Sequence, residues 1–321
     1  THSRSDGMSR AMNIFDEPKI DCHNHVFDPE RFPYQAGSFY LPAGQERGTP
    51  AQFMQVLDAY GVGHALLVQP NSGYGPDNRC LLDTINRNGR RLKGVAVVTN
   101  DVTCAELEQL KARGIVGIAF NPALSGVDAY ADAAGLLARI AELGLFAQIQ
   151  VQGDQLLELL PMLETSGARL VFDHCGRPDP DRGLQQPGFQ ALLELGRRGK
   201  ACVKLSGYAK FSRQPFPHED TWPYVHALAE AFTLDACVWG SDWPFLRAPE
   251  RVDYGTLLRL LERLFPDGSD RRKLLWDTPC ALFGFDSCSG AVGRIDNALD
   301  NANVTTPAGA ASLSAPPTVI E

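Results

Sequence analysis

Short apolar runs alternate with longer helical patterns along most of this 321-residue chain, and this alternation constrains the fold more than any single motif. The runs are rich in Val, Ile, Leu and Phe, as buried parallel strands are. A chain that repeats strand and helix in this way is expected to form a parallel sheet covered by helices. Eight runs can be counted, at residues 20–26, 64–70, 92–98, 115–121, 146–151, 169–175, 201–207 and 236–242. Eight strands favour a closed (β/α)8 barrel, the TIM barrel of the α/β class, which needs roughly 250 residues.

Helical patterns fill the intervals between these runs. Several of them end at a glycine where a helix C-cap favours one, for example at Gly61 and Gly144. The patterns cover residues 52–60, 77–88, 103–113, 128–143, 155–165, 189–198, 222–232 and 254–265. We therefore expect a barrel over residues 19–285, a flexible segment over residues 1–18, and a flexible tail over residues 286–321, which carries few large apolar side chains.

The composition narrows the class of partner. The formal net charge is −8 and no block of Lys or Arg occurs, which argues against a nucleic-acid-binding surface. No apolar run approaches the roughly 20 residues of a membrane span. The eight cysteines form no CxxC pair, which favours a reduced, cytoplasmic setting. The expected partner is a small molecule.

Three histidines and one aspartate stand at or near the ends of predicted strands. His23 and His25 are one residue apart, which places both side chains on one face of a strand, and His174 and Asp242 stand at the ends of two later strands. Active sites of such barrels lie at the carboxyl ends of the strands, so the four are expected to converge. Together they could bind a zinc-like ion, which lowers the pKa of its bound water to about 7. The alternative is that each histidine only completes the core or a loop.

Three aspartates near these histidines receive different predictions. Asp242 follows an apolar strand and precedes Trp243, so a partly desolvated general base is expected there, with a turn or helix-capping aspartate as the alternative. Asp21 is expected on the same face as His23, one layer deeper, where a structural role and a direct role are both open. Strand alternation predicts that Asp173 faces away from His174.

The other histidines and two lysines carry weaker signals. His64 opens a strand and His226 lies in a helix, so both are expected to be structural, and His218 is expected to be a solvated loop residue. Lys204 lies within the seventh strand, in a position that can enter the barrel. Lys210 lies in the loop after that strand, where a cation can hold a carboxylate or sulfonate.

Two long loops suggest a lid and walls for an anionic, planar ligand, because long loops in compact domains are often functional. Both combine aromatic side chains with polar or cationic ones. The loop over residues 27–50 carries Phe32, Tyr34, Phe39 and Tyr40, and the loop after the seventh strand carries Tyr208, Lys210, Phe211, Arg213 and Phe216.

Four motifs together resemble the amidohydrolase superfamily and, within it, the lactonase group typified by 2-pyrone-4,6-dicarboxylate hydrolase. They are IDCHNHVF at 20–27, YLP at 40–42, FDHCGRP at 172–178 and WGSDWP at 239–244. The resemblance spans roughly residues 19–284 and implies a distorted barrel that opens a lactone. It implies that Asp242 is the general base, that Tyr40 lies near the substrate, and that His23, His25 and His174 polarise the scissile carbonyl. They would do so directly in metal-free members, or through one zinc ion in others.

The chain departs from that group at positions that would bind substrate. Residues 117–125, which include Asn121, hold no cation where the group has arginines; Gln150 replaces a tyrosine, Phe245 a histidine and Lys210 an arginine. Fewer cations predict a less charged substrate or a differently placed anion, with muconolactones, sulfonated or plain, and sugar-acid lactones as candidates.

The leading hypothesis is a lactone hydrolase of aromatic-compound breakdown. A metal-dependent decarboxylase of an aromatic or unsaturated acid and a non-catalytic barrel that binds a small acid are the alternatives.

Overall fold

The computed structural model describes residues 13–286, which belong to one compact unit, Thr1–Ser287. The predicted segment 1–18 lies in part, and the predicted tail 286–321 almost entirely, outside the described residues. Residues 13–18 pack onto the barrel, because Ile14 is fully buried and Glu17 forms a buried ion pair with Arg271. The packed part therefore begins before residue 19.

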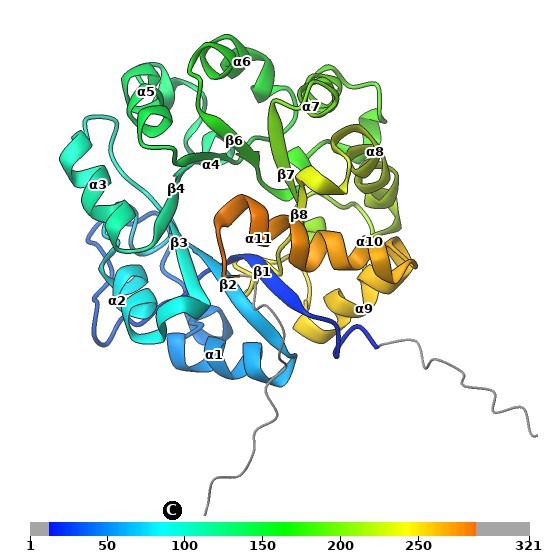
Figure 1. Ribbon diagram of the computed structural model, residues 1–321, viewed down its shortest axis with the longest axis horizontal. Helices are drawn as coiled ribbons and strands as arrows, with labels where there is room; N and C mark the ends of the chain where they lie inside the picture. The colour runs from blue at the N-terminus through cyan, green and yellow to red at the C-terminus, as the bar shows by residue number, and fades with distance from the viewer. Residues whose placement is uncertain (1–12, 287–321) are drawn as a thin grey trace, which may run out of the picture. The chain divides into compact units, whose positions relative to one another are not determined.

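Eight parallel strands form one sheet in sequence order, and helices surround it as a ring (Figure 1). All eight predicted strands are present, which confirms the expected fold. They are β1 (Lys19–Asn24), β2 (Val62–Val68), β3 (Leu92–Ala96), β4 (Ile115–Phe120), β5 (Phe146–Ile149), β6 (Arg169–Phe172), β7 (Ala201–Leu205) and β8 (Cys237–Trp239).

Eight of the described α-helices follow the predicted segments within a few residues, except that the segment 128–143 divides into a 3-10 turn and a shorter α-helix; α4, α10 and α11 were not predicted. The described α-helices are α1 (Pro50–Ala59), α2 (Arg79–Asn88), α3 (Cys104–Ala112), α4 (Pro122–Ser125), α5 (Ala134–Glu142), α6 (Gln155–Thr165), α7 (Pro187–Arg197), α8 (Trp222–Phe232), α9 (Tyr254–Leu264), α10 (Gly268–Arg272) and α11 (Thr278–Phe283). None of the described helices is long and apolar enough to cross a membrane.

The barrel closes between β8 and β1 through a few contacts at their carboxyl ends. The backbone N–H of Asp242 donates to the carbonyl of His23 at 2.7 Å, and the backbone N–H of His25 donates to the carbonyl of Trp243 at 2.8 Å. Gly240 permits this approach, since a Cβ there would lie 2.5 Å from the Cβ of His23. The closure sets the segment after β8 directly beside His23 of β1 and beside His25, which follows β1.

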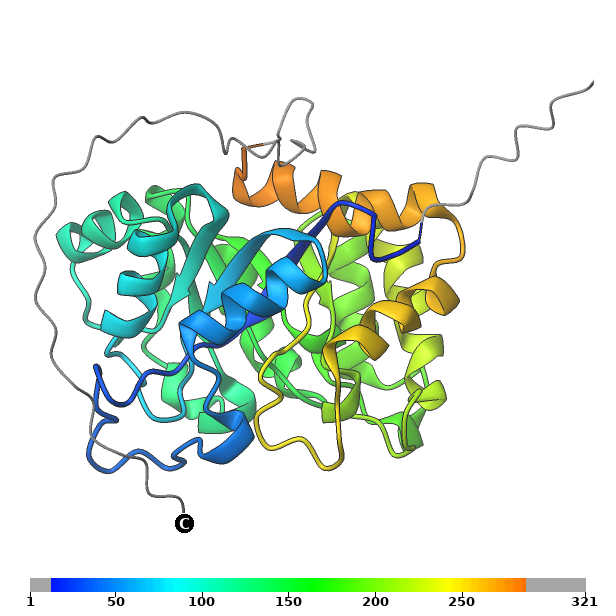
Figure 2. The ribbon, with the colours of Figure 1, turned by 90° about the horizontal axis from the view of Figure 1, so that it is seen from below.

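The two ends of the barrel differ. Figure 2 shows α10 and α11 over one end and the long loops after β1 and β8 at the other. The inner core contains strand residues such as Ile20, Leu66 and Val238, and Phe283 from α11 closes it at the amino end. A second, larger apolar layer lies between the strands and the helices. Packing therefore fills the amino end and leaves the carboxyl end for a cavity.

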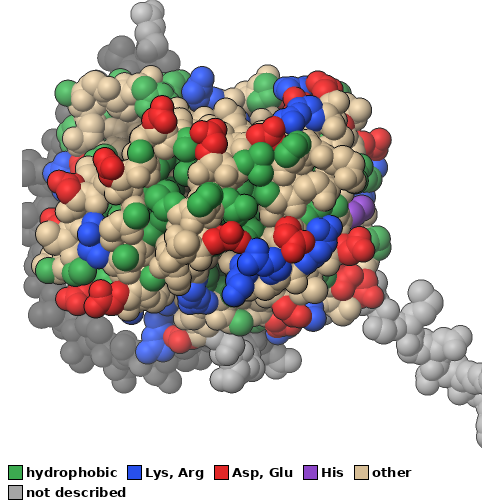
Figure 3. Space-filling view, turned by 90° about the horizontal axis from the view of Figure 1, so that it is seen from above, with side chains coloured by type: hydrophobic (Ala, Val, Ile, Leu, Met, Phe, Trp, Pro, Cys, Tyr) green, Lys and Arg blue, Asp and Glu red, His purple; other side chains and the backbone are tan. Residues whose placement is uncertain are grey.

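On the face shown in Figure 3, Lys and Arg side chains lie among Asp and Glu side chains rather than forming a continuous basic surface.

Candidate active site

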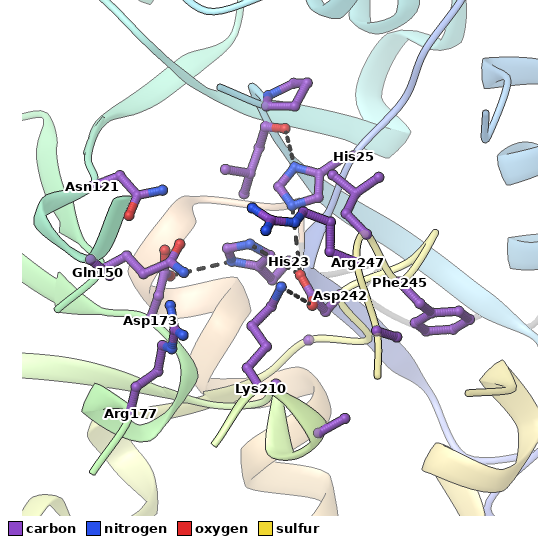
Figure 4. A pocket seen from close by; sticks show the side chains of 18 of the residues that line it. His23, His25, Asn121, Gln150, Asp173, Arg177, Lys210, Asp242, Phe245 and Arg247 are labelled. Atoms are coloured by element: carbon purple, nitrogen blue, oxygen red, sulfur yellow. Dashed lines mark hydrogen bonds and ion pairs between the residues drawn. The ribbon is translucent and has the colours of Figure 1, made fainter. Parts of the chain in front are cut away.

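The three predicted histidines converge on one oxygen of Asp242. The Nε2 atoms of His23, His25 and His174 lie 3.7, 3.6 and 3.7 Å from its Oδ1. Among residues 13–286, this buried oxygen has no hydrogen-bond partner. Lys210 contacts the other oxygen, with its Nζ 2.9 Å from Oδ2, and Figure 4 shows the lysine reaching Asp242 from the loop after β7.

The backbone at two strand ends aims these side chains. β6 ends at Phe172, and the next turn holds His174, Cys175, Gly176 and Arg177 at positive φ between 43° and 72°. Asp242 also has a positive φ, of 62°. Non-glycine residues adopt this region rarely and at a cost, which suggests that the site requires these orientations.

This turn explains why the prediction for Asp173 is wrong. Alternation required the strand to continue through His174, but β6 stops two residues earlier. Asp173 instead points inward, with Oδ1 3.3 Å from His23 Nδ1 and 3.2 Å from Lys204 Nζ.

The prediction for Asp21 also needs correction. The register between β1 and β2 shifts between Asp21 and Asn24, so alternation does not carry through His23. Asp21 accepts hydrogen bonds from Ser241 and from Tyr254 of α9, on the outer side of the strand. Its role in the structure is to join β1, β8 and α9.

Lys204 enters the barrel interior, where it has no exposed surface. Its Nζ lies 2.6 Å from Gln148 Oε1 and 3.2 Å from His23 Nδ1. Gln148 also donates to Asp173 Oδ2 at 2.9 Å. A buried network of four side chains therefore lies directly behind His23.

Burial and neighbouring charges shift the pKa values of these groups. Burial lowers the pKa of His23 to about 4, although Asp173 opposes the effect, and the pKa of His174 is also lowered, chiefly by burial. Burial alone would raise the pKa of Asp242, but Lys210 and the imidazoles outweigh it and hold that pKa well below its usual range. At neutral pH the site therefore holds an ionised Asp242, while His23 and His174 are neutral.

These residues fit a metal ion by their chemistry. Ligand atoms of His23, His174 and Asp242 lie within 4.8 Å of one another, all three residues are buried, and His25 approaches the same carboxylate. His25 Nδ1 lies 2.9 Å from the carbonyl oxygen of Val68. That oxygen only accepts, so Nδ1 carries a proton, and the Nε2 of a neutral His25 presents its lone pair toward Asp242. Imidazole nitrogens and a carboxylate whose oxygen has no hydrogen-bond partner within the described chain can hold a divalent cation.

A cavity of about 550 Å³ opens above this cluster at the carboxyl end of the barrel. Of the predicted substrate-binding residues, Asn121, Gln150, Tyr208, Lys210 and Arg213 line it, whereas Tyr40 does not. The Tyr208 hydroxyl donates a hydrogen bond to the backbone carbonyl of Leu205. The guanidinium of Arg213 also lies 3.4 Å from a carboxylate oxygen of Asp179 and 3.4 Å from one of Asp181. Neither aspartate lines the cavity.

Tyr40 serves the loops around the cavity rather than its lining. Its hydroxyl donates to Glu46, whose other carboxylate oxygen accepts from the backbone N–H of Arg247 at 2.6 Å. The carboxylate thus joins the loop after β1 to the loop after β8.

Sequence reasoning assigned no role to Arg177 or Arg247, two cations that line the cavity (Figure 4). Within the described chain, the buried Nε of Arg177 has no hydrogen-bond partner. Its place three residues after His174, in the same motif, was the signal available. Arg247 gave none, because the loop after β8 has no periodicity.

The remaining histidines lie away from the cavity lining. His64 and His226 contact the backbone carbonyls of Arg90 and Leu264. The prediction of a solvated His218 is wrong, because its side chain is buried beside the carbonyl of Gln214.

Comparison with known proteins places this site in context. A family model described as Amidohydrolase matches residues 20–285. A 4-sulfomuconolactone hydrolase of Rhizobium radiobacter is 33% identical over 275 residues, which are 82% of this chain and 89% of that protein. A 2-pyrone-4,6-dicarboxylate hydrolase of Comamonas testosteroni is 28% identical over 277 residues, with the same two shares. A crystal structure from Pseudomonas putida, provisionally described as a 2-pyrone-4,6-dicarboxylic acid hydrolase, superposes with a TM-score of 0.73 at 33% identity, over 84% of this chain and 98% of that one.

Proposed function

This chain belongs to the amidohydrolase family, and we propose that it hydrolyses a small anionic lactone of the kind formed in aromatic-compound breakdown, in the cytoplasm. The observation that carries the proposal is the partnerless Oδ1 of Asp242, which faces three imidazoles beneath a cavity with cations on its walls. Relatives named as hydrolases of a sulfonated lactone and of a dicarboxylated pyrone support the substrate class.

Asp242 acts as the general base in this proposal. Lys210 and the imidazoles keep it ionised, so its Oδ1 accepts a proton from a water molecule as the water oxygen attacks the lactone carbonyl. The C–O bond of the ring then breaks, and the leaving oxygen takes up the proton. The product is a single open-chain molecule that carries a carboxylate, formed with release of the second proton of the water, and a hydroxyl group, which tautomerises to a ketone where the leaving oxygen is enolic.

The negative charge that develops on the carbonyl oxygen needs donors nearby. In this proposal the Lys210 ammonium and the imidazole of His23, whose Nε2 lies 3.7 Å from Asp242 Oδ1, lie beside that carbonyl oxygen and are fixed before substrate binds. Such fixed donors can lower the barrier by several kcal/mol. A zinc ion held by His23, His25, His174 and Asp242 would supply a bound water with a pKa of about 7 and would polarise the same carbonyl.

The cations on the cavity wall select the substrate. Arg177, Lys210 and Arg247 belong to the loops after β6, β7 and β8, while Asn121 and Gln150 on the β4 and β5 side are uncharged. A carboxylate or sulfonate therefore binds on the β6 to β8 side, where guanidinium groups can form paired hydrogen bonds with it.

Turnover of a lactone panel by the purified enzyme tests the proposal. Metal content is measured first, and each of a muconolactone, its sulfonated form, the pyrone dicarboxylate and a sugar-acid lactone is assayed before and after chelator treatment. Lactone opening releases one proton per turnover and no carbon dioxide. Asp242→Asn should lower kcat by about 10³-fold or more, because the general base is lost.

The panel also decides between the alternatives. Carbon dioxide release from an aromatic or unsaturated acid would replace the proposal with a decarboxylase. Thermal stabilisation by a small acid, without turnover of any compound, would replace it with a binding protein.

A further inference from the structure

The hydrogen bonds behind His23, in β1, and His25, just after β1, differ in direction. His25 Nδ1 faces the carbonyl oxygen of Val68, an acceptor, so that nitrogen must donate. His23 Nδ1 faces the ammonium of Lys204 at 3.2 Å, and an ammonium has three donors and no acceptor. A neutral His23 that accepts this bond carries its single proton on Nε2.

A second group beside His23 Nδ1 could have reversed this arrangement. Asp173 Oδ1 is 3.3 Å away, but the contact lacks hydrogen-bond geometry, and within the described chain that oxygen has no hydrogen-bond partner. Asp173 is held independently, since its other oxygen accepts from Gln148 and its charge is balanced by Lys204.

The needs of Lys204 point the same way. It is fully buried, so bulk solvent does not reach it; its hydrogen-bond acceptors are Gln148 Oε1 and His23 Nδ1, and Asp173 Oδ1 lies 3.2 Å away as its ion-pair partner. A proton on His23 Nδ1 would set two donors against each other and remove one of those acceptors. Buried donors without partners are rare because they are costly.

From this geometry we propose that Lys204 is a positioning residue that fixes His23 as an Nε2–H donor into the cavity, while Val68 fixes His25 as the opposite tautomer. On the proposed lactonase function, His23 then donates to the developing oxyanion and His25 presents a lone pair.

Nitrogen-15 spectroscopy tests the tautomers without any substrate. Chelator-treated protein labelled with ¹⁵N-histidine is observed by long-range ¹H–¹⁵N correlation near pH 7, and the signals are assigned from the ones lost in His23→Gln and His25→Gln. We expect His23 to be protonated at Nε2 and His25 at Nδ1. Protonation of His23 at Nδ1 in this metal-free protein would overturn the proposal.

Variants test whether Lys204 is the cause of the His23 tautomer. Lys204→Met combined with Asp173→Leu removes both buried charges and leaves no N–H donor from either position beside His23 Nδ1, so His23 should lose its fixed Nε2–H pattern. Lys204→Gln, which keeps an N–H donor, should restore it in part. Lys19→Met is the matched control, because Lys19 is the other fully buried lysine and bonds only to backbone carbonyls at the opposite end. An unchanged His23 pattern in the double variant would overturn the proposal.

Kinetics separate this proposal from the proposed function. If the wild type turns over a lactone, the double variant should lose about 10²-fold in kcat with little change in KM, as the loss of one oxyanion donor does. If no lactone is turned over, the proposed function fails while the spectra still decide the tautomers.

Discussion

Two fully buried lysines, one at each end of the barrel, show how differently the two ends use charge. Lys19 at the amino end donates to the backbone carbonyls of Ile14, Phe15 and Glu17, at 2.7 to 3.0 Å. Lys204 near the carboxyl end faces only side chains, namely Gln148, His23 and Asp173. The first lysine ties the chain's start to the barrel, and the second lies behind a group that can take part in chemistry.

Buried polar side-chain atoms without hydrogen-bond partners are also distributed unequally between the two ends of the barrel. Among residues 13–286 there are six such side-chain atoms, and those of Gln69, Asp173, Arg177 and Asp242 belong to residues that line the cavity. At the amino end, Glu17 and Arg271 satisfy each other through several hydrogen bonds. Because unsatisfied buried groups are costly, their concentration at one end indicates where a ligand or water completes the structure.

The largest effect expected from this contrast is on stability. Lys19→Met leaves three carbonyl oxygens at the amino end without their donor, which should lower the free energy of unfolding by about 3 kcal/mol. The carboxyl end is untouched, so kcat at low temperature should not change. Urea unfolding measures the first quantity, and the exposed Lys200→Met is the control, with less than about 0.5 kcal/mol expected. A Lys19→Met protein that kept its stability but lost kcat would reverse the roles of the two ends.

Acid should destabilise the carboxyl end first. The pKa of His23 is about 4 in the folded chain and 6.5 in the unfolded one, so between those values the unfolded chain binds more protons and the folded state loses stability as pH falls. The shift corresponds to a loss on the order of 3 kcal/mol by pH 4, and His174 acts in the same direction. The lowered pKa of Asp173 extends the loss below pH 4. Lys19, whose pKa burial lowers to about 8, does not titrate in this window.

Urea unfolding at pH 7.0, 5.5 and 4.5 measures the effect of acid. His23→Gln should show a shallower decline than the wild type, because one of the shifted groups is gone. An equal decline in both proteins would assign the acid sensitivity to groups other than His23.

The fold could be predicted from the sequence more completely than the site, for a physical reason. Eight strands and their helices follow from periodic apolar patterns, which every residue of an element supports. The partners of His23 depend on single backbone events: the end of β6 at Phe172 reverses the direction of Asp173, and the shift in β1 turns Asp21 outward. Neither event has a periodic signal. Lys204 lies within a regular strand, β7, and its side chain enters the barrel as its position in the predicted strand allowed.

A variant of Arg177 tests the difference between the two ends of the barrel. It asks whether a buried atom without a protein partner at the carboxyl end binds the substrate. Arg177→Gln removes the guanidinium whose Nε has no protein partner in the described chain, so KM for an anionic lactone should rise about 10- to 100-fold. The same variant should change KM for an uncharged lactone of equal ring size much less. Steady-state kinetics on the two substrates measure the difference. Equal losses on both would mean that the arginine shapes the turn around His174 instead of binding the anion.

The smallest effect is expected at Tyr40, which the family resemblance places near the substrate. Its hydroxyl is already bonded to Glu46, and the ring lies under the guanidinium of Arg247 with 5.4 Å between the guanidinium carbon and the ring centroid. Tyr40→Phe keeps the ring contact and removes one partly exposed hydrogen bond, so kcat/KM should change less than about threefold and stability by about 1 kcal/mol or less. Glu46→Gln serves as the matched variant, because it keeps an acceptor for the backbone N–H of Arg247. A 100-fold loss of kcat/KM in Tyr40→Phe, without a similar loss in Glu46→Gln, would mean that the hydroxyl leaves Glu46 and enters the cavity once substrate is bound. The loops at the carboxyl end would then move during turnover while the amino end stays fixed.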